Sequence, residues 1–188
     1  DLDTQARWRL LGQLVNTPFF TQLRTEQQLG YVVGGYYQGE DLLPGVTMRI
    51  QSPVAGPKAL ETAVDTFLTD YFETLKAMPE AEFESIRAGL SARLRESRTM
   101  LDQKSRDYEI DLALGITTFD RTATLADRVD TLNKQELVEL WEQVFLGDDG
   151  RLVVRSFGNA HDEKADSGCN DEACTQKAMG PIYERELI

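Results

Sequence analysis

The feature that most constrains this fold is a change in sequence periodicity at Gly30. Before this point apolar residues recur at helical spacing, whereas Tyr31–Tyr37 is rich in β-branched and aromatic residues and predicts a strand. A turn with a proline and acidic residues follows, and Val46–Gln51 predicts the returning strand of an antiparallel hairpin. Gly34 and Gly35 indicate either a bulge in the first strand or a close approach by another backbone.

Helical patterns surround this hairpin. A helix is predicted from about Thr4 to Val15, an interruption at Asn16–Pro18, and then a short helical piece over Phe19–Gln28. Further helices are predicted to begin at or near Pro57, Pro79, Leu101 and a capping box at Asn133–Glu136, the last of them running through Phe145.

A closing strand is predicted for Arg151–Phe157. A thin antiparallel sheet with helices segregated to one face is an α+β layer structure. The composition turns polar and acidic after Gly158, so we expect an α+β domain over residues 1–158 and a polar acidic C-terminal tail or extension over residues 159–188. The tail holds Cys169 and Cys174, which are too few to complete a zinc site.

Composition argues against several classes of function. The formal net charge is −12, from 32 acidic and 20 basic residues. A nucleic-acid-binding surface needs a basic stripe, and an anionic membrane repels an acidic chain. No apolar run approaches the roughly 18 residues of a membrane helix. The acidity indicates simple solubility or, alternatively, an attraction for basic peptides.

The chain has one histidine, His161, which lies in the polar tail. The zinc peptidase motifs H-E-x-x-H and H-x-x-E-H place two histidines on one helix face, so counting excludes both motifs here. A Ser-His-Asp triad would have to use His161, which we expect to be a solvated surface side chain. This chain therefore cannot by itself build a histidine-based zinc site.

One stretch, Phe20–Tyr31, is less easily explained by solubility and core packing. It places Arg24 near the end of a helical segment and Tyr31 at the start of a strand, with Gly30 between them to let the chain turn sharply. Arg24 offers a fixed fork of N–H donors and Tyr31 a phenolic O–H, and both suit carbonyl or carboxylate oxygens. Two interpretations stay open: a pair of oxygen-binding donors, or an arginine that caps helix carbonyls beside a half-buried strand tyrosine.

The same stretch resembles a known family. Residues 19–33 contain the pattern F-F-x-x-L-R-T-x-x-Q-L-G-Y-x-V, which is similar to the C-terminal domain of the pitrilysin and insulin-degrading enzyme family. The run Ile50-Gln51-Ser52 and the apolar spacing over residues 60–68 fit the same region. The resemblance extends over about Trp8 to Gly158.

The resemblance implies a fold and a role. The fold would be the LuxS/metallohydrolase-like α+β domain of the pitrilysin family, lacking its first strand. Family members are zinc-dependent metalloendopeptidases that cleave peptides in an enclosed chamber, with zinc in the first domain and peptide contacts from the last. By that motif Arg24 and Tyr31 would be auxiliary catalytic and substrate-binding residues that hold the substrate carbonyl, or the oxyanion that develops on it.

The partners implied are the N-terminal catalytic domains of the same polypeptide and a peptide substrate, with no nucleic acid and no membrane. The chain alone is expected to be inactive, with no metal or cofactor of its own and zinc in the N-terminal domain of the full-length enzyme. The alternative is a zinc-less structural or partner subunit of a processing-peptidase-like assembly. Retention of both Arg24 and Tyr31 favours the peptidase. Related bacterial enzymes include periplasmic ones, which favours the periplasm over the cytoplasm.

Overall fold

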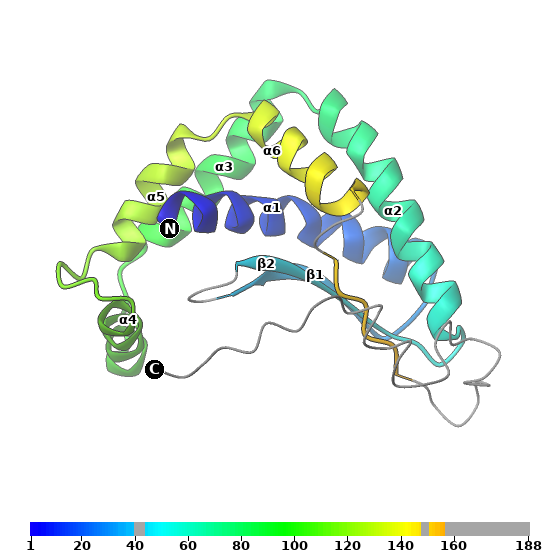
Figure 1. The fold of residues 1–188 in the computed structure, drawn as a ribbon, viewed down its shortest axis with the longest axis horizontal. Coiled ribbons are helices and arrows are strands. Elements are labelled where there is room, and N and C mark those ends of the chain that lie inside the picture. The colour runs from blue at the N-terminus through cyan, green and yellow to red at the C-terminus, as the bar shows by residue number, and fades with distance from the viewer. Residues whose placement is uncertain (40–43, 148–150, 157–188) are drawn as a thin grey trace.

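The computed structural model describes residues 1–39, 44–147 and 151–156. Within these ranges α1 lies directly over a β-hairpin, α2, α3, α5 and α6 lie over α1, and α4 stands at one end (Figure 1). The elements follow in this order: α1 (Leu2–Phe20), the π-helical turn η1 (Thr21–Glu26), β1 (Val32–Gln38), β2 (Gly45–Gln51), α2 (Pro57–Ala77), α3 (Glu80–Arg95), α4 (Leu101–Ala113), α5 (Arg121–Thr131), α6 (Lys134–Trp141) and the π-helical turn η2 (Glu142–Leu146).

The sheet is the predicted antiparallel hairpin. β1 pairs with β2 in a continuous register from Val32 opposite Gln51 to Gln38 opposite Gly45. The register holds no bulge, so the bulge that was one explanation for Gly34 and Gly35 is excluded. A small antiparallel sheet with helices packed on one face confirms the predicted α+β class.

The glycines serve a close approach between α1 and β1. A Cβ atom on Gly35 would lie 2.6 Å from Cγ1 of Val15, and one on Gly12 would lie 2.6 Å from the backbone nitrogen of Tyr37. Both positions therefore require the absence of a side chain. The Asn16 side chain adds a hydrogen bond of 2.9 Å from Nδ2 to the carbonyl of Gly35. We call this contact the glycine seam.

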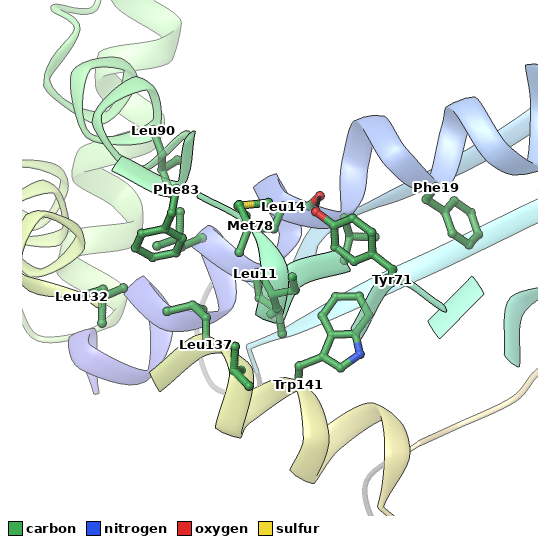
Figure 2. Packing of buried hydrophobic residues seen from close by; sticks show 14 of the residues in the cluster. Leu11, Leu14, Phe19, Tyr71, Met78, Phe83, Leu90, Leu132, Leu137 and Trp141 are labelled. Atoms are coloured by element: carbon green, nitrogen blue, oxygen red, sulfur yellow. Dashed lines mark hydrogen bonds between the residues drawn. The ribbon is translucent and has the colours of Figure 1, made fainter. Parts of the chain in front are cut away.

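The hydrophobic core fills the space between α1 and the outer helices (Figure 2). Tyr71 of α2 and Trp141 of α6 lie side by side with ring centroids 5.2 Å apart. The Trp141 indole donates from Nε1 to the carbonyl of Leu68 at 3.1 Å, so its one polar atom is satisfied inside the core. Because α1 is sandwiched between hairpin and helices, it buries residues on both of its faces, including Leu10, Leu11, Leu14, Val15 and Phe19.

The predicted interruption at Asn16–Pro18 is wrong, because α1 continues through Pro18 to Phe20. Proline lacks the N–H that would donate to the carbonyl of Leu14. The buried hydroxyl of Tyr71 donates to that carbonyl instead, at 3.0 Å. Beyond the proline the helix widens into η1, where Gln27 N donates to the carbonyl of Gln22.

The predicted closing strand is also wrong over its described part, since residues 151–156 form no strand. This segment is held by its arginines rather than by a β-ladder. Arg155 Nη2 lies 2.5 Å from a carboxylate oxygen of Glu61, and Arg151 pairs with Asp65 one helical turn further along α2. The apolar side chains that suggested a strand, Leu152 and Val154, are exposed.

The remaining helices follow their sequence signals, with one exception. The Asn133 side chain accepts a hydrogen bond from Glu136 N at 3.0 Å, so the predicted N-cap of α6 is confirmed. The helix that was not predicted is α5, which packs against α1 and α3.

Across the described ranges no helix is both long and apolar enough to cross a membrane. The predicted tail and its His161, Cys169 and Cys174 lie outside the described residues.

Candidate functional site

The structure brings Arg24 and Tyr31 together. Arg24 lies in η1, at the end of the long N-terminal helix, and Tyr31 lies immediately before β1. The Nε atom of Arg24 donates to the backbone carbonyl of Tyr31 at 3.2 Å. The turn between them therefore folds back on itself and closes with this hydrogen bond.

The guanidinium group of Arg24 also contacts two aromatic rings. Its central carbon lies 5.0 Å from the ring centroid of Phe20 and 5.5 Å from that of Tyr31. Both distances are within the reach of a cation–π interaction. Arg24 is half-buried between the rings, so its position is set by three contacts rather than by one.

The polar ends of both side chains remain available. Tyr31 is 81% exposed, and within the described part of the chain its hydroxyl forms no hydrogen bond. Only Nε of Arg24 is engaged there, which leaves the donors on both Nη atoms without a protein acceptor. The two side chains thus present several N–H and O–H donors to solvent from one small area. An oxygen-rich ligand, such as a peptide backbone, suits such a set.

The predicted role of Gly30 needs a correction. The residue of this turn with left-handed backbone is Gln28, at φ 52°, and Gly30 is not among the residues with positive φ. A Cβ atom on Gly30 would collide with the carbonyl oxygen of Gln51 in β2. Gly30 is therefore needed because the chain passes directly against the neighbouring strand. Leu29 N donates to the carbonyl of Leu23 at 3.0 Å and closes the end of η1.

Phe20 is the member of this group that the sequence did not single out. It lies four positions before Arg24, and side chains at this spacing are neighbours on a helix surface. That spacing was the available signal, but an exposed phenylalanine near a helix end has no distinctive chemistry of its own. Its 39% exposure shows that one side of the ring remains open to solvent.

The described residues of this chain do not form a zinc site. Among the described residues, no group of three histidine, cysteine, aspartate or glutamate side chains is placed to hold a metal ion. The histidine count of the whole sequence excludes the two-histidine motifs independently. Arg24 is a cation without an acceptor atom and would repel a metal ion rather than bind it.

A groove of about 530 Å³ lies between α1, η1, α2 and α3, and neither Arg24 nor Tyr31 is among its lining residues. Tyr71 forms part of its lining, together with Glu82 and Pro18. Burial raises the pKa of Tyr71 to about 12, and the nearby Glu82 carboxylate adds to this shift. The hydroxyl therefore stays protonated at neutral pH and serves as the donor to Leu14.

Comparison with known proteins identifies the family. The family described as PQQ synthase PqqF-like, C-terminal lobe domain 4, matches residues 10–109, which include η1, Tyr31 and the hairpin. The chain belongs to this family. The crystal structure of pitrilysin superposes on it with a TM-score of 0.69 at 27% identity, over 76% of this chain and 15% of pitrilysin. The resemblance to the pitrilysin and insulin-degrading enzyme family is thus confirmed.

Relatives from distant organisms agree with this assignment. The peroxisomal insulin-degrading enzyme-like 1 of Arabidopsis thaliana is 27% identical over 164 residues, which are 86% of this chain and 17% of the relative. Protease 3 of Escherichia coli strain K12 is 26% identical over 157 residues, 84% of this chain and 16% of the relative. The PqqF-like domain spans about one-sixth of the length of these relatives. It is homologous to the C-terminal lobes of pitrilysin-family zinc metallopeptidases.

Proposed function

We propose that this domain holds peptide substrate and assists transition-state stabilisation in a zinc-dependent metalloendopeptidase that cleaves peptides in an enclosed chamber. The observation that carries the proposal is the Arg24–Tyr31 contact, in which the backbone and both rings fix two side chains whose donors face solvent. Homology to proteases supplies the class of reaction in which such donors are useful.

The donors would act on the peptide carbonyl. When a nucleophile attacks a peptide carbonyl, negative charge develops on the oxygen, and a hydrogen bond to that oxygen strengthens as the charge grows. The Tyr31 hydroxyl and the Nη donors of Arg24 can reach an oxygen without losing existing bonds. Because the Arg24 contacts are formed in advance, little reorganisation is needed when the charge appears.

The zinc chemistry of the reaction would come from another part of the protein. Since the sequence lacks both two-histidine zinc motifs and the described residues form no metal site, we assign zinc to the N-terminal domain of a full-length enzyme. The partners proposed for this chain are therefore the N-terminal catalytic domains of the same polypeptide and the peptide itself. The net charge of −12 supports neither a nucleic acid nor an anionic membrane as partner.

The decisive experiment is Tyr31→Phe in the full-length protein, assayed for peptide hydrolysis with zinc present. Loss of one oxyanion donor should lower kcat by about one to three decades, with KM changing much less. Arg24→Ala should lower kcat/KM to a similar extent. Tyr108→Phe is the matched control, because it removes an exposed phenol hydroxyl on α4 that forms no hydrogen bond in the described ranges.

Unchanged kinetics in Tyr31→Phe would remove the catalytic role assigned to this residue. Hydrolysis by the full-length protein but not by this chain alone would support the division of the site between domains. No hydrolysis by the full-length protein would instead favour a zinc-less structural or partner subunit.

A further inference from the structure

The hairpin has one covered face and one open face. Val33, Gly35 and Tyr37 alternate toward α1 along β1. Val32, Gly34 and Tyr36 therefore point to the opposite side, since successive residues of a strand alternate between faces. In the β1–β2 register their partners on that side are Gln51, Arg49 and Thr47. Tyr36 is 41% exposed, and Arg49 and Gln51 are exposed, so the face is open within the described ranges.

Arg49 is the positively charged side chain that the two strands present on this open face. Within the described ranges it forms neither an ion pair nor a hydrogen bond. Six other described arginines of this acidic chain are paired with carboxylates: Arg95, Arg98, Arg121, Arg128, Arg151 and Arg155. The open face itself presents no acidic side chain from either strand. An incoming carboxylate would therefore meet Arg49 without competition from an acidic side chain of β1 or β2.

The residue directly opposite Arg49 on β1 is a glycine, so no side chain occupies that position. Gly34 is the cross-strand partner of Arg49, and the ring of Tyr36 lies along the strand against it, with Cδ1 3.7 Å from the place a Cβ would occupy. We call this position, with the Tyr36 ring beside it and Arg49 opposite it on β2, the seat. Apart from the Tyr36 ring and the adjacent residues of β1, no atom lies within 4 Å of the place a Cβ of Gly34 would occupy.

The seat is also close to the candidate catalytic pair. Gly34 follows Tyr31 by three positions, and a strand rises about 3.3 Å per residue, so the seat lies roughly 10 Å along β1 from Tyr31. An extended peptide has the same rise. A peptide that runs alongside β1 on its open face, with its carbonyl held at Tyr31, would place a side chain about three residues away over the seat.

We propose that Arg49 is a specificity-determining residue that binds an acidic side chain of the peptide, about three residues from the carbonyl held at Arg24 and Tyr31. This inference rests on the proposed function, because it takes the occupant of the open face to be the peptide substrate. The guanidinium fork matches a carboxylate in a bidentate pair, whereas an amide of the same shape offers one acceptor and no charge.

The test is a binding measurement that does not require turnover. The probes are fluorescein-labelled 12-residue peptides of alanine, serine and leucine that carry a single Glu, each matched with a peptide that carries Gln at the same position. The Glu is moved one position at a time along the peptide. Fluorescence anisotropy is measured on the full-length protein with a chelator present to prevent hydrolysis. At one position, or two adjacent ones, the Glu peptide should bind roughly 3- to 10-fold more tightly than its Gln partner.

Arg49→Gln should abolish that preference without changing the affinity for the Gln peptides, and Arg49→Lys should retain part of it. Arg106→Gln is the matched control, because Arg106 is exposed on α4 and forms no ion pair in the described residues. Its substitution changes the net charge by the same amount as Arg49→Gln. A wild-type protein that binds Glu and Gln peptides equally, or a preference that survives Arg49→Gln, overturns the proposal. Failure of the full-length protein to hydrolyse any peptide with zinc would instead count against the proposed function, because anisotropy reports the Arg49 preference separately.

Discussion

Asp111 and Arg121 form an ion pair that is buried from solvent. Oδ1 of Asp111 lies 2.5 Å from Nε of Arg121, and each side chain is 4% exposed. The pair joins the end of α4 to the first residue of α5. Asp107 lies 4.0 Å from the same guanidinium and is itself bound by Arg98. A buried charge without its partner is costly, so the two residues depend on one another.

Asp111→Ala should lower the free energy of unfolding by about 3–5 kcal/mol, because it leaves the Arg121 charge buried without its nearest partner. Urea denaturation followed by circular dichroism measures the change. The double variant Asp111→Leu/Arg121→Met should recover most of the loss, since apolar replacements of a buried pair are often neutral. Glu73→Ala, which breaks the exposed pair with Lys76, serves as control and should cost at most about 1 kcal/mol. Equal effects from the two alanine variants would contradict this account.

Tyr71→Phe should destabilise the domain by about 1–3 kcal/mol, because the Leu14 carbonyl would lose its donor while remaining buried. Pro18 cannot replace that donor. The measurement is the midpoint and slope of urea unfolding, compared with Tyr108→Phe, whose hydroxyl is exposed. A shift no larger than that of Tyr108→Phe would show that the bond contributes nothing.

The stability of the domain should fall in alkaline solution between about pH 10 and pH 12. The pKa of Tyr71 is raised by burial to about 12 in the folded chain, above the ordinary value of 10.0. Its contribution is fully present below pH 10 and is lost as the pH rises through the folded pKa, because the unfolded chain releases the proton first. A pKa difference of two units between the folded and unfolded chain corresponds to about 2–3 kcal/mol in the free energy of unfolding.

This alkaline loss can be assigned to one residue by comparison. The free energy of unfolding should decline less steeply in Tyr71→Phe than in the wild type over that interval, since the remaining tyrosines titrate in both proteins. If the free energies of unfolding of the two proteins fell in parallel with pH, the raised pKa would belong to a residue other than Tyr71.

Two glycine-to-alanine substitutions should have opposite effects. Gly30→Ala forces a Cβ into the carbonyl of Gln51 and should cost about 1–3 kcal/mol, and displacement of the following Tyr31 should also reduce peptide hydrolysis by the full-length protein. Gly89→Ala in α3 meets nothing within 4 Å and should stabilise the domain by about 0.5–1 kcal/mol. Thermal unfolding of both variants tests the pair. If Gly30→Ala left the stability unchanged, β2 would have moved at Gln51 to make room for the added methyl group.

The sequence predicted those elements whose signals are local. The hairpin, the apolar stripes of α2 and α3, and the Asn133 cap of α6 each depend on neighbouring residues, and the structure confirms them. The failures involve distant partners. Local rules end a helix at Pro18, but the bond that compensates comes from Tyr71, far along the chain. Residues 151–156 have strand-like composition, yet their arginines bind carboxylates on α2.

The candidate site shows the same difference between local sequence signals, which were recognised, and contacts with other residues, which were not. The sequence pattern pointed to Arg24 and Tyr31, and their catalytic and substrate-binding roles remain predictions. It did not indicate that Phe20 packs on Arg24, nor that Gly30 is needed for its contact with Gln51 rather than for a left-handed turn. α5 was missed although its buried residues Leu125, Ala126 and Val129 recur at helical spacing; the structure packs it against α1 and α3.

The glycine seam has a mechanical consequence. At Gly12 the helix lies against the backbone of Tyr37, and at Gly35 the strand lies against the side chain of Val15, so α1 and β1 pack as one close unit. Arg24 lies in η1, directly after α1, and Tyr31 lies directly before β1, so both residues are attached to this unit. We therefore expect any opening and closing around a peptide to use a hinge outside the glycine seam, which would bring both side chains to the substrate together.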